Sequence, residues 1–355
     1  MAAWTWFIPA LSVALLVGAI VVGVGALLAV ICAIGLVGAV IAGVHHAEVV
    51  AHRVGEPFGT LVLAVAVTVI EASLILSMMF AGGEDAAVLP RDTIYAAVMI
   101  ICNGVVGICV LTGGLAHHEQ SFRVEGSSAG LAALIAMSAL VLVLPDFTTT
   151  TPSGTYSTSQ LIFTAVVSAV LWAVFVFIQT VRHRDYFLPV SDVSNADTHA
   201  VPPTNRAAWA SFGLLLVSLV AVVGLAKVLS PTIERVVVEA GAPKAVLGIV
   251  IAMLVLMPET WAAIRAGRAN RLQNSMNLAI GSALASIGLT IPVVAVTAIV
   301  FGLPLIMGLE PKDLVMLALT FLVSAVTLGT GRTHMMQGAV HLVIFAAFLF
   351  LSFVP

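Results

Sequence analysis

Apolar runs of about 20 residues, separated by short polar connections, follow one another along almost the whole chain. A helix of that length crosses roughly 30 Å of hydrocarbon, whereas the strands of a membrane barrel would alternate apolar and polar positions. The pattern therefore predicts an all-α polytopic membrane protein. We expect eleven spanning helices, at residues 6–24, 26–44, 57–80, 93–116, 128–145, 157–181, 209–229, 244–264, 274–301, 313–328 and 335–353.

Two features of this pattern divide the chain. The first apolar stretch is too long for a single crossing, and its Gly-rich segment at 23–27 predicts a turn. A long polar connection rich in Pro, Asp, Asn and Thr has the character of a linker. With the first helix set aside, five spans precede this linker and five follow it, so the two halves enter the membrane from opposite sides, which is the layout of inverted repeats. The expected organisation is an extra N-terminal helix (1–25), a first five-helix repeat (26–181, motif 55–116), a cytoplasmic linker (182–208) and a second five-helix repeat (209–355, motif 241–301).

The composition agrees with a membrane protein. Hydrophobic residues make up 61% of the chain and charged residues 9%, against roughly half and about a quarter in soluble domains. The formal net charge of -3 and the lack of a basic tract argue against nucleic acid as a partner. Cys32, Cys102 and Cys109 lie in apolar runs without metal-type spacing, so we expect packing residues and no disulfide framework. We expect no cofactor.

Basic residues in the connections predict the orientation, because Lys and Arg concentrate on the cytoplasmic side. With eleven crossings, nine of them fall on one side and four on the other. We therefore expect a multi-pass protein of the bacterial inner membrane, with the N-terminus in the cytoplasm and the C-terminus outside. The nine are Arg53, Arg123, Arg182, Arg184, Arg206, Arg265, Arg268, Arg271 and Arg332, and the four are Arg91, Arg235, Lys244 and Lys312.

One glutamate lies inside a spanning helix in each half of the chain. Glu71 belongs to GEPFGTLVLAVAVTVIEASLILSMM and Glu259 to GAPKAVLGIVIAMLVLMPETWAAIRAG. Each segment begins with Gly-X-Pro and continues as an apolar helix, so the two carboxylates are expected at similar depths in helices of opposite orientation. An ionised group at the bilayer centre costs about 3 kcal/mol on insertion scales, and such residues are usually functional. The alternative is a satisfied, inert pair, which the matching positions disfavour.

Two buried carboxylates are suited to exchanging a cation for protons. Ca²⁺ takes six to eight oxygen ligands, and like-charged carboxylates that are close and desolvated take up protons when the cation leaves. Pro258 removes a backbone donor before Glu259 and adds a carbonyl to the candidate ligands. The metal ligands that we expect are Glu71, Glu259, Thr68, Asn103, Asn277 and Ser282, with Ser286 nearby and Glu56 at the cytoplasmic entrance.

Several segments together resemble the calcium/cation antiporter superfamily. They are HRVGEPFGT, TVIEAS, RDTIYAAVMIICNGVVG, GGLAHHEQSF, PETWAAIRAGRANRLQNSMNLAIGSALASIGLTIPVV and TGRTHMMQGAVHL. Within the superfamily the chain is similar to the calcium/proton exchangers, most of all the bacterial ChaA-type antiporters, from about residue 45 to 353. The resemblance implies an inverted pair of five-helix units in which Glu71 and Glu259 bind the cation.

The chain departs from that family pattern around the first glutamate. Thr68 stands where the exchangers usually have Asn, and Val98 and Met99 stand where they have Gly-Ser. In the second motif, Asn277 and Ser282 lie within the matching segment. The resemblance therefore implies proton exchange and leaves Ca²⁺, Na⁺ and K⁺ open as the transported cation.

Other polar residues admit two interpretations. Glu56 is either an entry ligand or a charge favoured at a helix start. His45, His46, Glu48 and His52 cluster on the cytoplasmic side with helical spacing. Such a set of histidines can sense pH, but a solvated helix end is the simpler interpretation. His341, inside the last span, is interpreted as a satisfied packing histidine rather than a proton relay.

We expect a secondary active transporter, not an enzyme, that exports Ca²⁺, Na⁺ or K⁺ against protons by alternating access. Its partners would be those ions, protons and the lipid bilayer, and the oligomeric state stays open. A cation channel with a carboxylate selectivity site is the alternative, which the inverted halves disfavour. A membrane enzyme is the third class of function, and no nucleophile or HExxH-type pair supports it.

Overall fold

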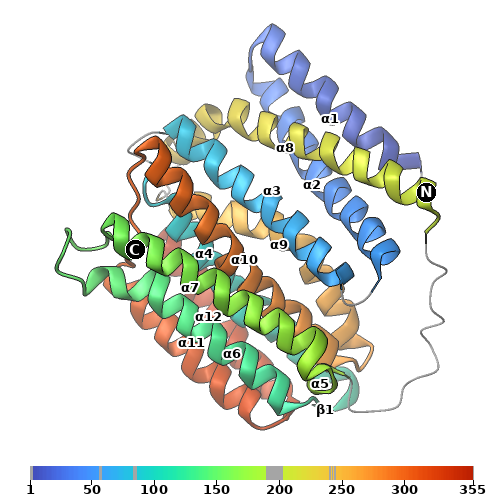
Figure 1. Ribbon diagram of the computed structural model, residues 1–355, viewed down its shortest axis with the longest axis vertical. Helices are drawn as coiled ribbons and strands as arrows, with labels where there is room; N and C mark the ends of the chain where they lie inside the picture. The colour runs from blue at the N-terminus through green and yellow to red at the C-terminus, as the bar shows by residue number, and fades with distance from the viewer. Residues whose placement is uncertain are drawn as a thin grey trace. The chain divides into compact units, whose positions relative to one another are not determined.

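The computed structural model describes residues 3–55, 58–82, 86–188, 203–239, 241, 243 and 245–354 (Figure 1). The described chain is nearly all helical, and 11 helices are long and apolar enough to cross a membrane. The predicted fold class and number of spans are confirmed. These helices are Ala3–Val22, Ala26–Val54, Val62–Gly82, Leu89–His117, Val124–Asp146, Thr158–Arg182, Asn205–Ile233, Ala245–Arg268, Leu272–Phe301, Pro311–Gly329 and Met335–Phe353.

The helices fall into two compact units, and the first takes its members from both sides of the linker. Within it, α8 packs against the three other helices, and α2 contacts all of them (Figure 1). Its helices are α1 (Ala3–Val22), α2 (Ala26–Val54), α3 (Phe58–Gly82) and α8 (Asn205–Glu239).

The turn between α1 and α2 confirms the predicted break in the first apolar stretch. Gly23 adopts φ 80°, a left-handed conformation that glycine reaches without strain. The second helix is longer than predicted, because it continues past residue 44 to Val54 and ends at Gly55, with φ 77°. No proline or glycine interrupts residues 45–54, so the helix has no reason to stop at the polar histidines.

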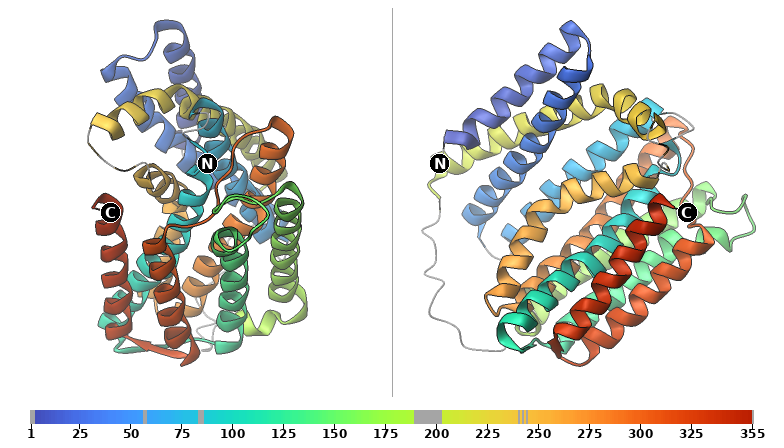
Figure 2. Two further views of the ribbon diagram at one scale, coloured as in Figure 1. Left: turned by 90° about the vertical axis from the view of Figure 1, so that its left-hand side faces the viewer. Right: turned by 180° about the vertical axis from the view of Figure 1, so that it is seen from behind.

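The second unit contains the remaining spans. There α10 packs against α6, α7 and α9, while α12 lies along α5, as Figure 2 also shows. Its core is a large cluster of fully buried apolar side chains that includes Leu134, Met137, Leu142 and Leu284. Its helices are α4 (Leu89–Met99) and α5 (Val106–His117), α6 (Val124–Ser138), α7 (Thr158–Phe177), α9 (Ala245–Arg268), α10 (Leu272–Phe301), α11 (Pro311–Gly329) and α12 (Met335–Phe353).

Three stretches of π-helix interrupt the α-helices of this unit: η2 (Ile100–Val105), η3 (Ala139–Val143) and η5 (Ile178–Arg182). A π-helix bonds residues five apart and often marks a functional position. The first, η2, joins α4 to α5 without breaking the span. Two single-turn 3₁₀ helices, η4 (Leu144–Asp146) and η6 (Arg184–Phe187), end the fifth span and follow the sixth.

Within the part of the chain that the structure describes, a two-stranded antiparallel sheet is added to the predicted all-α fold. Strand β1 (Glu119–Ser121) pairs with β2 (Arg332–His334), directly after α5 and directly before α12. Strands of three residues are too short to show the alternation by which a sequence predicts strands, so the sheet could not be anticipated.

The two units do not follow the boundaries of the predicted repeats. The first motif is divided, with α3 in the first unit and α4–α5 in the second, whereas both helices of the second motif, α9 and α10, lie in the second unit. The repeats at 26–181 and 209–355 are a symmetry of the chain that contacts do not test, and they stay a prediction.

Candidate functional site

Glu71 lies in the middle of α3 and is buried, with 4% of its surface exposed. Thr68, three residues earlier and on the same face of the helix, is 5% exposed. The next buried polar residue along α3, Ser77, donates a hydrogen bond of 3.3 Å to the carbonyl of Val223 on α8. These three polar side chains of α3 therefore face the interior of the first unit. Glu56, the predicted entry ligand, lies outside the described residues.

Glu259 lies in α9 and is partly buried. Pro258 stands inside the same helix. Because proline has no N–H, the carbonyl of Leu254, four residues earlier, lies outside the hydrogen-bond ladder of α9. A carboxylate and a carbonyl outside the ladder on one helix are both oxygen donors of the kind that hard cations take.

Two glycines bring α9 against the span formed by α4, η2 and α5. A side chain at Gly248 would lie 2.7 Å from the carbonyl carbon of Asp92, and one at Gly267 would lie 3.2 Å from the Cβ of Cys109. The two spans therefore run parallel in close backbone contact. Glu259 lies between the two glycines at the level of η2, which contacts α9. The second predicted carboxylate and Asn103 thus share one level of one unit.

Asn103, inside η2, is fully buried and forms hydrogen bonds to two other helices. Its Nδ2 donates to Thr320 Oγ1 on α11 at 2.9 Å, and its Oδ1 lies 3.2 Å from His341 Nδ1 on α12. The other ring nitrogen of His341 lies 3.0 Å from Thr327 Oγ1 on α11. The interpretation of His341 as a satisfied buried histidine is confirmed.

Asn277, at the start of α10, makes contacts that differ from those of Asn103. Its Nδ2 donates to the carbonyl of Phe187 at 2.6 Å, and its Oδ1 accepts from Gln273 Nε2 at 2.8 Å. The amide thus ties α10 to η6. Ser282 is partly buried farther along α10, and Ser286 is 3% exposed. The ligand roles of Asn277 and Ser282 stay predictions.

Sequence reasoning missed the α11 partners of this site. Thr320 and Thr327 are 0% and 2% exposed, but threonines are common in apolar helices and nothing in their spacing marks them.

Sequence reasoning also missed the contacts of Arg91. Its Nε donates to Asp92 Oδ1 at 2.8 Å, and its Nη1 donates to the carbonyl of Gly308 at 2.9 Å. An adjacent Arg-Asp pair at the start of an apolar span is a signal that could have found it. Within the described residues, no three His, Cys, Asp or Glu side chains gather as a metal cluster.

The histidines of α2 correct another interpretation. His46 is fully buried, not part of a solvated helix end, and its Nε2 donates to the carbonyl of Thr5 at 2.8 Å. The reason is that α1 packs along α2 and covers this turn. The neighbouring His45 also contacts α1, where the centroid of its ring lies 5.1 Å from that of Trp4.

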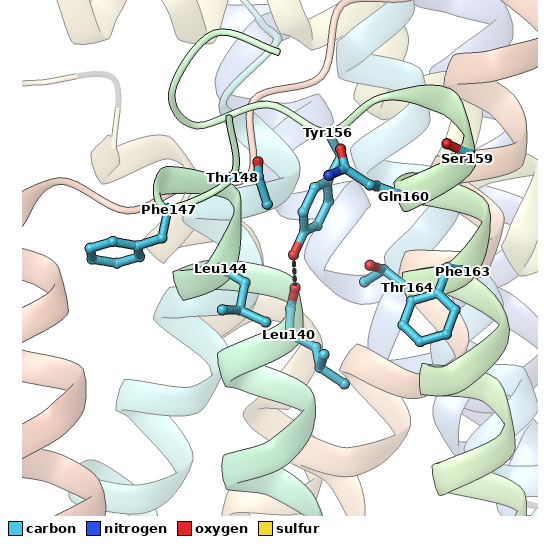
Figure 3. A pocket seen from close by; sticks show the side chains of 9 residues that line it. All are labelled: Leu140, Leu144, Phe147, Thr148, Tyr156, Ser159, Gln160, Phe163 and Thr164. Carbon is cyan, nitrogen blue, oxygen red and sulfur yellow. Dashed lines mark hydrogen bonds between the residues drawn. The ribbon is translucent and has the colours of Figure 1, made fainter. Parts of the chain in front are cut away.

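A pocket of about 340 Å³ lies at one end of the second unit, between the end of the fifth span and the start of the sixth (Figure 3). The Tyr156 hydroxyl donates to the carbonyl of Leu140, in η3, at 2.6 Å. The described lining includes none of the predicted ion ligands, and its character is mainly apolar. The lining residues are Leu140, Leu144, Phe147, Thr148, Tyr156, Ser159, Gln160, Phe163 and Thr164.

Comparison with known proteins adds to this geometry. The family described as sodium/calcium exchanger protein matches residues 9–181 and 210–354. The chain is 47% identical to y4hA of Sinorhizobium fredii, whose name is that of an ionic transporter, over 99% of this chain and 96% of y4hA. It is 35% identical to the sodium-potassium/proton antiporter ChaA of Escherichia coli, over 90% of this chain and 87% of ChaA.

Among solved structures, the fold is similar to that of YfkE. The TM-score is 0.75 at 17% sequence identity, and the match covers 99% of this chain and 100% of YfkE. At that identity the likeness concerns the fold alone. It extends over both sides of the linker and over the described spans, the first included.

Proposed function

Because this chain belongs to the sodium/calcium exchanger protein family, a family of transporters and not enzymes, we propose that it exports Ca²⁺, Na⁺ or K⁺ in exchange for protons. The burial of Glu71 carries this proposal. A carboxylate with 4% of its surface exposed, in a spanning helix, is costly to keep charged unless a cation or a proton accompanies it. A group with that requirement is the natural carrier in an exchanger.

Glu71 and Glu259 are the two exchange carboxylates in this proposal. Each is negatively charged with a cation bound and takes up a proton when the cation leaves, since a carboxylate without a counter-charge is costly in a desolvated site. Thr68, Asn103, Asn277 and Ser282 supply neutral oxygens that complete a hard cation's shell. Binding of cation and proton is then mutually exclusive, which makes the transport an exchange.

The choice of cation follows from the neighbours of Glu71. The name of ChaA specifies sodium and potassium, and Thr68 offers a single hydroxyl beside the first carboxylate. We propose that Na⁺ and K⁺ are substrates as well as Ca²⁺, and that each of them is exchanged for protons. We further propose the predicted organisation, in which the inverted repeats 26–181 and 209–355 alternate access and the N-terminus is cytoplasmic in the bacterial inner membrane.

The test is cation/proton exchange in proteoliposomes, with Ca²⁺, Na⁺ and K⁺ supplied separately across a range of pH. Glu71→Gln and Glu259→Gln keep the size of the side chain and remove the charge, so we expect each to abolish exchange of every cation that the parent protein carries. Glu125→Gln and Glu239→Gln are matched controls, because both glutamates are exposed at helix ends. Controls should exchange at the parent rate.

Two results would overturn this proposal. Undiminished exchange by Glu71→Gln or Glu259→Gln would remove that residue from the site. Downhill cation flux with no proton counterflow would identify a channel.

A further inference from the structure

A chain of four buried polar side chains runs through the core of the second unit. Asn103, Thr320 and His341 are 0% exposed and Thr327 is 2% exposed. They come from three different elements, η2, α11 and α12. Each polar group in such surroundings is costly unless bonded, so the bonds among them decide how each side chain is oriented.

The hydrogen bonds of this chain have one direction. Asn103 Oδ1 can only accept, so His341 Nδ1 carries the proton and donates to it. The Nε2 of a neutral ring then has to accept, and Thr327 Oγ1 donates to it. On the other side, Asn103 Nδ2 donates to Thr320 Oγ1, which donates in turn to the carbonyl of Met316 at 2.8 Å.

Close glycine packing fixes the height of His341 beside Asn103. A side chain at Gly107 would lie 3.1 Å from the Cβ of His341, and one at Gly338 would lie 2.4 Å from the backbone nitrogen of Leu111. Both contacts hold α12 against α5 at backbone distance. The imidazole can therefore reach Asn103 one turn away, and neither helix can slide without a clash.

These hydrogen bonds determine which donors and acceptors of the Asn103 amide remain available for a further partner. One N–H of its amide bonds to Thr320, and the amide nitrogen also lies 3.9 Å from Met99 Sδ. The oxygen has two lone pairs, and His341 uses one. Reversal of the amide would place its N–H against the Nδ1–H of His341, so the histidine holds the oxygen in place as an acceptor.

We propose that His341 is a positioning residue for transport: it holds the Asn103 carboxamide so that the second lone pair of Oδ1 serves the transported cation. This inference rests on the proposed function, in which Asn103 is a cation ligand at the level of Glu259. Thr327 acts one step farther away, because its hydroxyl selects the ring tautomer that donates to Asn103. Groups that orient a ligand in this way change metal affinity by about 10–100-fold when removed.

Two amide substitutions separate positioning from packing. The Nδ2 of Asn occupies nearly the place of the imidazole Nδ1, whereas the amide of Gln reaches to the place of Nε2. His341→Asn therefore retains the donor to Asn103, and His341→Gln loses it. The measurement is the KM and the maximal rate for each transported cation in proteoliposomes, with thermal stability recorded in parallel.

We expect His341→Gln to raise the cation KM by about tenfold. In the separate variant His341→Asn, the KM should stay near the parent value. Thr327→Val, which keeps the shape of the side chain, should raise the KM by a smaller factor in the same direction. His46→Leu is the control, because it also removes a buried histidine but one bonded to Thr5. It should lower stability and leave the KM unchanged.

Equal KM values for His341→Asn and His341→Gln, or a fall in maximal rate at constant KM, would overturn the positioning role and leave a packing histidine. If either His341 variant fails to fold, Thr327→Val decides alone, and a parent-like KM then counts against the proposal. Downhill cation flux with no proton counterflow in the parent protein would overturn the proposed function itself, whereas undiminished exchange by Glu71→Gln would only remove that residue from the site. Loss of exchange in that variant together with a parent-like KM in the His341 variants refutes the positioning role alone.

Discussion

The helices that carry the two glutamates, α3 and α9, look alike in sequence and are built differently in the protein. In α3, Glu71 is 4% exposed, and the described side chains next to it are mostly buried and apolar. In α9, Glu259 is partly exposed, follows a proline inside the helix, and lies between two glycines in backbone contact with the neighbouring span. A pair matched along the chain is thus not matched in burial, so the two carboxylates need not tolerate the same change.

Shortening each glutamate by one methylene should produce the largest difference. Glu71→Asp moves a carboxylate in closely packed surroundings, where a displacement of about 1 Å can cost about 100-fold in rate. Glu259→Asp acts where the residue as a whole is less completely buried, so that a small shift can compensate, and we expect a loss of about tenfold or less. Initial rates of cation-driven proton release in proteoliposomes measure both. Equal losses would show that the difference in burial has no functional weight.

A glycine-to-alanine substitution should disrupt the contact between α9 and α4 in the second unit. The same substitution in α2 should leave the contact between α2 and α3 in the first unit intact. At Gly248 an added methyl meets the backbone of Asp92 and Thr93 at 2.7–2.8 Å, and overpacking of this kind costs about 1–3 kcal/mol. At Gly43 it meets the flexible end of Ile70 at 3.3 Å. We expect Gly248→Ala to lower the unfolding temperature in detergent and Gly43→Ala to change it little. Gly281→Ala, with nothing within 4 Å, should be neutral or stabilising because Ala favours the helix.

Loss of the Tyr156 hydroxyl should give the smallest effect and separates stability from transport. Tyr156→Phe removes the bond to the Leu140 carbonyl, and we expect a loss of about 1 kcal/mol in stability with unchanged exchange. Burial raises the pKa of Tyr156 above its usual value. A raised pKa keeps the neutral, bonded form at every pH below about 10, and the contribution is lost only as the pH rises through the raised value.

The size of the Tyr156→Phe effect should therefore be the same at pH 6 and pH 8. Thermal unfolding of both proteins at the two pH values tests this. A difference that appears between them would mean that another titrating group acts on the same bond.

The sequence predicted the spans well, because a crossing helix has to be apolar over a fixed length. The turn at Gly23 and the number of spans follow from that rule. The contacts between helices do not, since they depend on which glycine faces which backbone, as at Gly248 and Gly107. Because the units are defined by these contacts, their boundaries differ from those of the predicted repeats.

The candidate site was predictable in its charged members and not in its neutral ones. Glu71 and Glu259 are conspicuous because carboxylates are rare inside spans. Asn103 was named, but its partners Thr320 and His341 lie more than 200 residues away in sequence. No local pattern encodes such a contact, and a threonine in an apolar helix is unremarkable by itself.

The short sheet has a consequence for the order in which the chain is assembled. Strand β1 follows the fourth span, and its partner β2 precedes the last, so Glu119 and Arg332, which form an ion pair of 3.2 Å, are 213 residues apart. During synthesis the segment at 119–121 emerges early and has no β-partner until residues 332–334 have been made. The helix α12 then completes the second unit. A chain arrested before residue 332 would therefore lack both the partner strand of β1 and His341, the partner of Asn103.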